Sequence, residues 1–263
     1  MKKLSLSFAL ALLALSAGSV FAAEKPRPLK VLLVTGGGFH DFTAQRKTLS
    51  EGITARANVE FTIVQEGETR EHRMSIYENP DWAKGYDVVM HNECFGMVAD
   101  QAFVERVAAP HHAGVPAVIL HASVHSYRNA PTDEWRQVIG QKSMSHETKR
   151  DIVVKSLGTD HPVMRGFPAV WPDASDELYK IEKVWPNVIP LAKSYGEETK
   201  QEHVVIWLNT YGKGRVFTTT LGHTDETMKS AVYLDLVTRG LLWACGKLTD
   251  DGNPAPGYGP GGK

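Results

Sequence analysis

Histidines follow the short apolar segments of this sequence, and carboxylates accompany some of them. His40, His91, His121 and His223 each come at the end of an apolar run or just after the glycines that close one. Neutral imidazole is a ligand for divalent metals, and imidazole beside carboxylate suits general acid–base catalysis. A single histidine in such a place is more often structural, but four at equivalent places predict a shared site.

Two kinds of chemistry fit these residues. A divalent ion such as zinc would take four of them as ligands: His40, Glu93, His121 and His223. A site without metal would use the same residues as general acid and base around a sugar, with Asn92 and Arg128 holding its hydroxyl groups. The spacing of His121 and His125 does not decide between the two, because the glutamate of zincins is missing from this H-x-x-x-H segment.

The segment after residues 116–121 is where many α/β hydrolases place a nucleophilic serine. Their G-x-S-x-G pattern aligns with residues 121–125, but both glycine positions are occupied by histidine. The strained turn needs small flanking residues, so Ser123 is a poor nucleophile. The segment supplies two imidazoles instead, with Arg128 three residues further on.

Three consecutive glycines at residues 36–38 could cradle a phosphate group. The dinucleotide pattern G-x-G-x-x-G would require glycine at position 41, where the sequence has Asp41, and its charge repels pyrophosphate. We therefore expect a tight turn that lets the backbone pass close to a ligand.

Apolar runs and helical spacing predict the elements that would position these residues. In the first half they are strands at 30–35, 59–64, 86–91 and 116–121, and helices at 42–56 and 100–113. Buried strands joined by helices indicate a mainly parallel sheet with right-handed crossovers. Ligands gather beyond the carboxyl ends of such strands, so the histidines should face one cleft.

The second half of the chain reads as antiparallel strands and a closing helix. Strands are expected at 151–156, 177–182, 188–194, 203–209 and 215–221. A glycine turn at residues 212–214 predicts a hairpin between the last two. The proline-rich residues 160–173 predict a long loop, pinned to the body by Trp171, and residues 227–245 predict a helix.

Composition and the ends of the chain limit the class of protein. With 263 residues, 42% hydrophobic residues and a formal net charge of -1, the chain is globular, and nucleic-acid binding is not expected. Two lysines, an apolar run and a final Val-Phe-Ala predict a signal peptide over residues 1–22, cleaved after Ala22. An extended leader at 23–29, one domain at 30–248 and a disordered tail at 249–263 would follow. The protein should then be periplasmic or secreted and leave the membrane after cleavage.

Several other polar residues receive structural interpretations. Cys94, at the end of a strand, could be core, ligand or nucleophile, whereas Cys245 lies in an apolar helix. The sequence leaves open whether the two form a disulfide, which requires Cα atoms within about 7 Å. His111 and His112 are expected to be a solvated pair that favours the dipole of its helix.

Five strings together resemble the ThuA-like, or trehalose-utilisation, family. They are GGGFHDF (36–42), VPAVILHASVHSYR (115–128), DHPVMRGFP (160–168), DELYKI (176–181) and YGKGRVFTTTLGHTDET (211–227). The likeness covers nearly all of the chain after residue 22. It implies an α/β fold in three layers, with a mainly parallel sheet of the flavodoxin-like, class I glutamine amidotransferase-like type and an added antiparallel hairpin.

The resemblance also implies carbohydrate use, in relatives associated with 3-keto-sugars made by partner oxidoreductases. The family motifs fall on His40, His121, His146, Glu177 and His223. Features of a closer, exported subgroup fall on Glu93, Cys94, His125, Arg128 and Glu226. Since the chain has no elbow cysteine, glutamine hydrolysis is not carried over with the fold.

The leading hypothesis is an enzyme acting on a sugar or 3-keto-sugar by hydrolysis, isomerisation or proton abstraction beside a carbonyl. His121 or His223 would be the base and Glu177 or Glu93 the acid, with His146 as a further catalytic candidate. The substrate would be held by His40, Asn92, His125, Arg128 and Glu226.

The alternative is a non-catalytic carbohydrate-binding module. Its sugar platforms would be Trp82, Trp135, Trp171, Trp185 and Tyr127, although most of these rings are expected in the core. The sequence leaves open whether a divalent metal is bound and whether the chain forms a homo-oligomer. A small-molecule carbohydrate is the expected partner.

Overall fold

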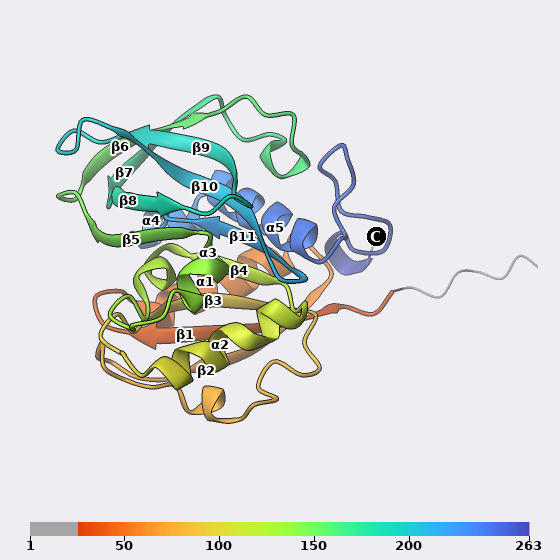
Figure 1. Cartoon of the computed structure of the whole chain (residues 1–263). Helices are drawn as coiled ribbons and strands as arrows, with labels where there is room; N and C mark the ends of the chain where they lie inside the picture. Colours follow the sequence, from red (N-terminus) through yellow and green to blue (C-terminus); the bar gives the residue numbers. More distant parts are fainter. Residues whose placement is uncertain (1–25, 263) are drawn as a thin grey trace, which may run out of the picture.

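Figure 1 shows the computed structural model, which describes residues 26–262. A nine-stranded sheet with the order β2-β1-β3-β4-β11-β10-β9-β6-β7 forms its centre. Five strands at one end run parallel: β2 (Val59–Gln65), β1 (Leu29–Gly37), β3 (Val88–Cys94), β4 (Ala117–Leu120) and β11 (Gly214–Thr219). The others join antiparallel: β10 (Glu202–Tyr211), β9 (Ile189–Tyr195), β6 (Arg150–Ser156) and β7 (Val170–Asp176). The predicted sheet, parallel at its core with an antiparallel extension, is confirmed.

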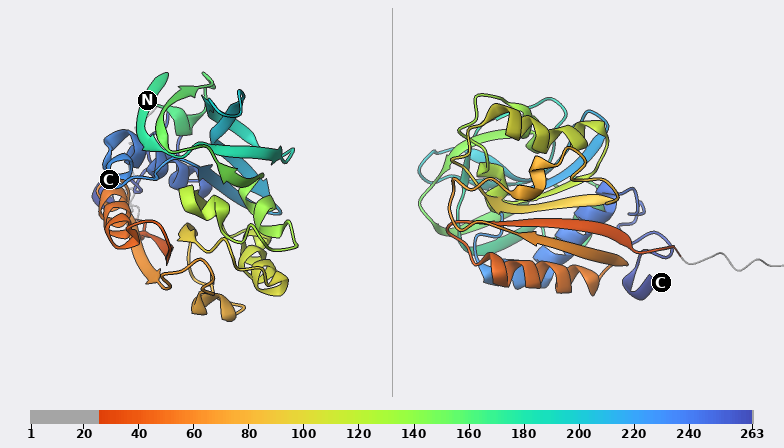
Figure 2. Two further views of the ribbon diagram at one scale, coloured as in Figure 1. Left: turned by 90° about the vertical axis from the view of Figure 1, so that its left-hand side faces the viewer. Right: turned by 90° about the horizontal axis from the view of Figure 1, so that it is seen from below.

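Helices cover both faces of the parallel strands, which makes three layers (Figure 2). On one face, α1 (Phe42–Thr54) and α5 (Ala231–Ala244) share a core with Val31 and Leu33 of β1. On the other face, α2 (Gln101–Ala113) and α3 (Glu134–Ile139) pack with Leu32 and Val34 of the same strand. Successive strand residues point to opposite faces, so burial on both sides requires the unbroken apolar run seen in the sequence.

A second, two-stranded sheet stands beside the main one. It pairs β5 (Gln141–His146) antiparallel with β8 (Tyr179–Val184). The polar sequence QKSMSH of β5 gave no signal for a strand. The short helix α3 just before it was not predicted either. The chain crosses from β7 to β8 through Glu177, so this small sheet holds that residue near the ends of the parallel strands.

Side-chain caps fix where the helices after two candidate histidines begin. Asp41 caps α1 by accepting a hydrogen bond from Ala44 N at 2.9 Å, directly after His40. Thr224 accepts a bond from Thr227 N at 3.2 Å and caps α4 (Asp225–Lys229), directly after His223. Such caps satisfy backbone donors that a helix cannot pair itself. The single helix expected at 227–245 is therefore two helices, separated at Ser230, which caps α5.

Two segments are more ordered than their composition indicates. Residues 249–262, expected to be a disordered tail, pack on the body: Asn58 N donates to Tyr258 O at 2.9 Å, and the Tyr258 ring contacts the core next to α1 and α5. The last residues of the loop expected at 160–173 belong to β7. Trp171 packs against the body, as expected. Gly and Pro prevent regular structure more than they prevent packing.

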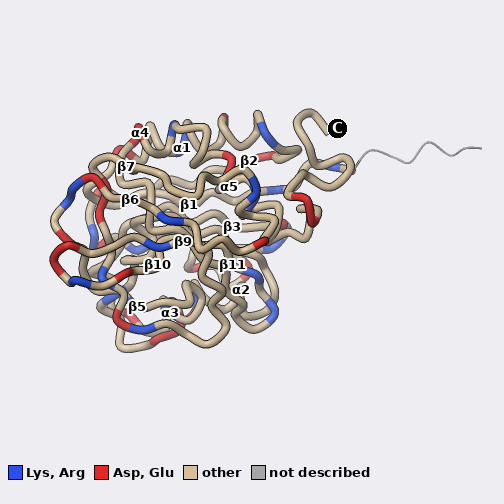
Figure 3. The backbone as a smooth tube through the Cα atoms, turned by 90° about the horizontal axis from the view of Figure 1, so that it is seen from above, with Lys and Arg blue, Asp and Glu red and all other residues tan. Residues whose placement is uncertain are grey.

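Charge and hydropathy of the described chain are typical of a globular protein. Figure 3 shows basic and acidic residues interleaved along the backbone, in keeping with the net charge of -1. Within residues 26–262, no helix has the length and apolar character needed to cross a bilayer. The expected signal peptide at 1–22 lies outside the described residues.

Candidate functional site

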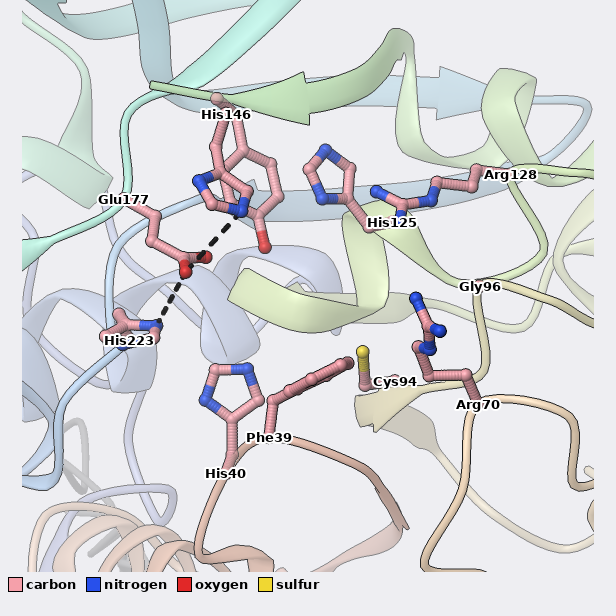
Figure 4. A pocket seen from close by; sticks show the side chains of 11 residues that line it. Phe39, His40, Arg70, Cys94, Gly96, His125, Arg128, His146, Glu177 and His223 are labelled. Carbon is pink, nitrogen blue, oxygen red and sulfur yellow. Dashed lines mark ion pairs between the residues drawn. The ribbon is translucent and has the colours of Figure 1, made fainter. Parts of the chain in front are cut away.

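A cavity of about 400 Å³ lies beyond the carboxyl ends of β1, β3 and β4 (Figure 4). Ligands occupy this position in open α/β sheets. Its walls come from the loops that follow these strands, from the turn after β11 and from the small sheet. The lining residues are Phe39, His40, Arg70, Cys94, Gly96, His125, Arg128, His146, Glu177, Tyr179 and His223.

Three of the predicted histidines meet at one end of this cavity. His40, His121 and His223 each offer a ring nitrogen that lies within 4.8 Å of the other two. His121 Nε2 and His223 Nδ1 lie 3.3 Å apart. Residues from the ends of three different strands thus form one group of nitrogen ligands or proton carriers.

Unusual backbone conformations at the ends of β1 and β4 set the positions of His40 and His121. Gly36 has φ +137°, and a Cβ there would lie 1.9 Å from the Glu66 carbonyl oxygen, so only glycine fits. The glycine turn passes close to neighbouring strands, where we expected a close approach to a ligand. Phe39 and His121 adopt φ +79° and +35°, a region that non-glycine residues seldom occupy and that recurs at functional sites.

Glu177 sits between three imidazoles. Its carboxylate oxygens lie 3.6 Å from His121 Nε2, 3.5 Å from His223 Nδ1 and 3.6 Å from His146 Nε2. Figure 4 shows the contacts to His223 and His146 as dashed lines. Burial raises the pKa of the Glu177 carboxyl, but hydrogen bonding from His121 and His223 and the charges of His121 and His146 outweigh this and hold the pKa far below its ordinary value. Glu177 is therefore ionised at neutral pH.

Hydrogen bonds fix the tautomers of two of these rings. His121 Nδ1 lies 2.6 Å from Thr220 O, and His146 Nδ1 lies 2.8 Å from Glu147 O. A carbonyl oxygen only accepts, so both Nδ1 atoms carry a proton. The Nε2 atoms then face a carboxylate, which also only accepts. The two Nε2 atoms are therefore the ring positions that could take up a proton or bind a metal ion.

The remaining two imidazoles of the site are neutral. Burial, followed by the neighbouring His121 and His223, lowers the pKa of His40 to about 3. Burial, followed by the charge of Arg128, holds the pKa of His125 well below its usual value. His125 is also fixed in place by a 2.9 Å hydrogen bond to Ser143 Oγ and by stacking on Tyr179 at 3.8 Å.

No activated nucleophile faces the cavity among the described residues. Burial raises the pKa of the Cys94 thiol to about 11, which keeps it protonated. Ser123 is fully buried, and its Oγ accepts from Glu93 N and donates to Glu93 O. Cys94 and Cys245 are both free, so the structure has no disulfide between them.

Three predicted residues lie away from the cavity. β3 ends at Cys94, three residues later than expected, so Asn92 and Glu93 lie inside the sheet. Asn92 Nδ2 donates to Gln45 Oε1 of α1 at 3.1 Å. Glu226 is exposed on α4. Their positions do not support metal or acid roles for Glu93, or substrate contacts for Asn92 and Glu226.

Glu93 belongs to a separate buried group. Its Oε1 lies 2.9 Å from His91 Nδ1 and accepts from the Tyr77 hydroxyl at 3.1 Å. His91 Nε2 in turn lies 3.1 Å from His111 Nε2, and His111 Nδ1 donates to Val115 O at 2.9 Å. The expectation of a solvated His111 is therefore wrong, because this ring faces the sheet, while its neighbour His112 is exposed.

The sequence did not single out several residues that line the cavity. Phe39 is 75% exposed at its mouth, although it stands inside the glycine–histidine motif. Tyr179 lies two residues from Glu177, which was the available signal for it. Arg70 comes from an irregular loop without a motif. By contrast, Trp82, Trp135 and Tyr127 are buried and offer no ring face to a ligand.

Comparison with known families gives one match. A family model described as ThuA, trehalose utilisation, matches residues 30–244. No curated protein sequence matches the chain.

Solved structures share the fold at low sequence identity. A ThuA-like protein from Parabacteroides merdae superposes with a TM-score of 0.67 at 20% identity, over 83% of this chain and 90% of that one. A ThuA-like protein from Bacteroides uniformis gives 0.63 at 15% identity, over 90% and 99%. A Thermoplasma acidophilum protein described as a GMP synthase component gives 0.51 at 13%, over 84% and 96%. The fold is thus of the class I glutamine amidotransferase-like type.

Proposed function

Because the chain belongs to the ThuA, trehalose-utilisation, family and so has a carbohydrate-related role, we propose that it is an enzyme that moves a proton on a sugar or 3-keto-sugar. The observation that carries the proposal is the ionised carboxylate of Glu177, held at the cavity wall between three imidazoles. Carboxylates and imidazoles in hydrogen-bonding reach of one another are the usual groups of acid–base catalysis.

Glu177 acts as the base in this proposal, although the sequence left it as a candidate acid. The carboxylate is ionised and has no proton of its own to donate, and a keto group acidifies the C–H bonds beside it, so that a weak base can remove the proton. His146 and His223, each with a ring nitrogen near the same carboxylate, can receive that proton or return it to the substrate. His121 is anchored by Thr220 and keeps the carboxylate oriented.

The shape of the cavity suits one small ring. Its volume of about 400 Å³ falls within the range of small-molecule sites. The exposed face of Phe39 at the mouth offers the apolar surface on which a sugar ring can stack. A disaccharide such as trehalose would place one ring inside and the other at the mouth.

We propose a divalent metal as a partner of this chemistry. His40, His121 and His223 supply three nitrogen ligands, the set found in several catalytic zinc sites, and a bound ion would polarise a carbonyl oxygen. The bond from His121 Nδ1 to a backbone carbonyl is the outer-shell contact that orients metal-bound histidines. Metal analysis of protein purified without an affinity tag, before and after zinc supplementation, tests this. About one equivalent, lost in His223→Ala, is expected; far less than one in the wild type removes the metal.

Turnover of a panel of keto-sugars tests the enzyme itself. Purified protein is incubated with 3-keto-trehalose, 3-keto-glucosides and their unoxidised parents, and products are followed by NMR. We expect conversion of the keto-sugars only. No conversion across the panel, together with tight sugar binding that survives His121→Ala and His223→Ala, would establish the carbohydrate-binding module instead.

We also propose that the protein works outside the cytoplasm. The support is the sequence of residues 1–22, with its basic start, apolar run and small residues at the expected cleavage point. Mass spectrometry of the protein recovered from the native host should give an N-terminus at Ala23. An intact N-terminus in the cytoplasmic fraction would contradict this.

A further inference from the structure

Two arginines line the cavity on the side away from Glu177 (Figure 4). Arg128 makes one hydrogen bond, from Nη1 to Met144 O at 3.0 Å. The guanidinium of Arg70 lies over the Phe39 ring, 5.3 Å from its centroid. Neither arginine has a carboxylate within ion-pair distance among residues 26–262, whereas Arg73 pairs with both Glu78 and Asp100.

The fold brings these arginines to one place from two loops. The loop with Gly96 joins them: Met97 N donates to Arg70 O at 3.1 Å, and a Cβ on Gly96 would lie 3.3 Å from Arg128 Nε. The same Cβ would lie 3.0 Å from His125 O, so glycine at position 96 lets this loop pass close to residues 125–128. Tyr127, at φ +57°, turns the chain so that Arg128 follows it into the cavity.

The charges lining the cavity do not balance. Arg70 and Arg128 carry two positive charges, while Glu177 is the single carboxylate among the lining residues. The chain as a whole has a net charge of -1, so the positive charge is a local property of this wall. Guanidinium groups present planar sets of donors that match carboxylate and phosphate oxygens.

We propose that the substrate is an anionic carbohydrate, a sugar acid or sugar phosphate, whose charged oxygens bind Arg70 and Arg128 while its reacting carbon faces Glu177. The carbohydrate part rests on the function proposed above. The anion part rests on the two arginines alone. Phe39, beneath Arg70 and at the mouth, contacts the ring between these two ends.

Calorimetric titration of the full chain with matched ligands tests this inference. Glucose, glucuronate and glucose 6-phosphate differ in charge and anion type at one carbon, and D-glycerate is an anion without a sugar ring. We expect one anionic sugar to bind about tenfold or more tightly than glucose. Arg70→Gln and Arg128→Gln should each remove most of that preference, measured as the ratio of anionic-sugar affinity to glucose affinity in the same variant. Arg165→Gln, in an exposed ion pair with Asp160, is the matched control and should keep it.

Each outcome has a defined meaning. The tighter of glucuronate and glucose 6-phosphate identifies the anion as carboxylate or phosphate. Equal affinity for glucose and both anionic sugars, or a preference that survives both arginine substitutions, overturns the inference. Binding of D-glycerate through Arg70 without binding of any sugar overturns the carbohydrate part. Arginine-dependent binding of glucuronate without turnover of any keto-sugar supports the anion site and counts against the proposed enzyme.

Discussion

Two groups of histidines, each around a glutamate, differ in their location, their burial and the lengths of their contacts. The open group consists of Glu177 with His121, His146 and His223 at the cavity. The closed group consists of Glu93 with His91, His111 and Tyr77 inside the sheet. The sequence offered both glutamates as the general acid, and Glu93 as a metal ligand as well.

The contacts show why only one group is placed for chemistry. In the closed group the contacts among the four side chains measure 2.9 to 3.2 Å, and all four side chains are fully buried. In the open group the distances from carboxylate to imidazole are 3.5 to 3.6 Å, and two rings have both nitrogens facing acceptors. Paired buried polar groups stabilise a fold, whereas unsatisfied groups at a cavity can bind and react.

The largest expected effect is on activity at the open group. Glu177→Gln removes the base but keeps the shape of the side chain, so we expect kcat/KM for a keto-sugar substrate to fall by about 10²–10⁴-fold. The unfolding midpoint should change by less than about 2 °C, since the residue reaches the cavity. Steady-state kinetics and thermal unfolding of the purified variant measure both. A loss below threefold would remove Glu177 from catalysis.

The closed group should show the opposite pattern. Glu93→Ala leaves His91 and Tyr77 without their buried partner and should lower the free energy of unfolding by about 3–5 kcal/mol. Activity per folded molecule should stay near that of the wild type. Urea denaturation gives the first quantity and active-site-normalised kinetics the second. A stable but inactive variant would mean that the closed group takes part in the reaction.

Zinc should bind the open group and not the closed one, which can be measured as a gain in the free energy of unfolding. At a hundred times its dissociation constant, a ligand of the native state adds about 2.7 kcal/mol to the free energy of unfolding. We expect this gain for the wild type, its reversal by a chelator, and no gain for His223→Ala. Equal stabilisation of wild type and His223→Ala would place the ion outside the open group.

The effect at His111 accumulates gradually with pH, as a change in the pH dependence of stability. Burial, with a contribution from His91, lowers its pKa to about 3 in the folded state, against about 6.5 in the unfolded chain. The unfolded state binds the proton first, so the stability contribution is full above pH 6.5 and is lost as the pH falls toward 3.

Urea denaturation at several pH values measures this effect. His111→Gln cannot take up that proton, and we expect its stability to fall less steeply between pH 6 and pH 4, by about 1.4 kcal/mol per pH unit. The exposed neighbour His112 provides the control, as His112→Gln should keep the slope of the wild type. Identical slopes for both variants would contradict a neutral, buried His111.

The contrast between the open and the closed group also shows which parts of the fold and of the site could be predicted from the sequence. Runs such as residues 30–35 identify parallel strands because burial on two faces demands continuous apolar residues. Their position at the ends of those strands predicted that His40, His121 and His223 lie close together, as they do in the structure. A three-residue error at the end of β3 was enough to misplace Glu93, because position along a strand decides between interior and cavity.

Other features left no trace in the sequence. The strand β5 is polar because it belongs to a small sheet, and hydrophobic patterns do not reveal such strands. Arg70 reaches the cavity from an irregular loop whose backbone accepts a hydrogen bond from Met97 N, 27 residues further along the chain. Contacts of this kind depend on tertiary structure, and no local spacing predicts them.

Deuterium exchange tests the central claim most directly, since proton abstraction precedes any later step of hydrolysis or isomerisation. Wild type and Glu177→Gln are incubated in D2O with a 3-keto-glucoside, and NMR follows the loss of the C–H signals beside the carbonyl. The account predicts exchange well above the uncatalysed rate with the wild type and about a hundredfold less with Glu177→Gln. Equal exchange rates for the two proteins would contradict it.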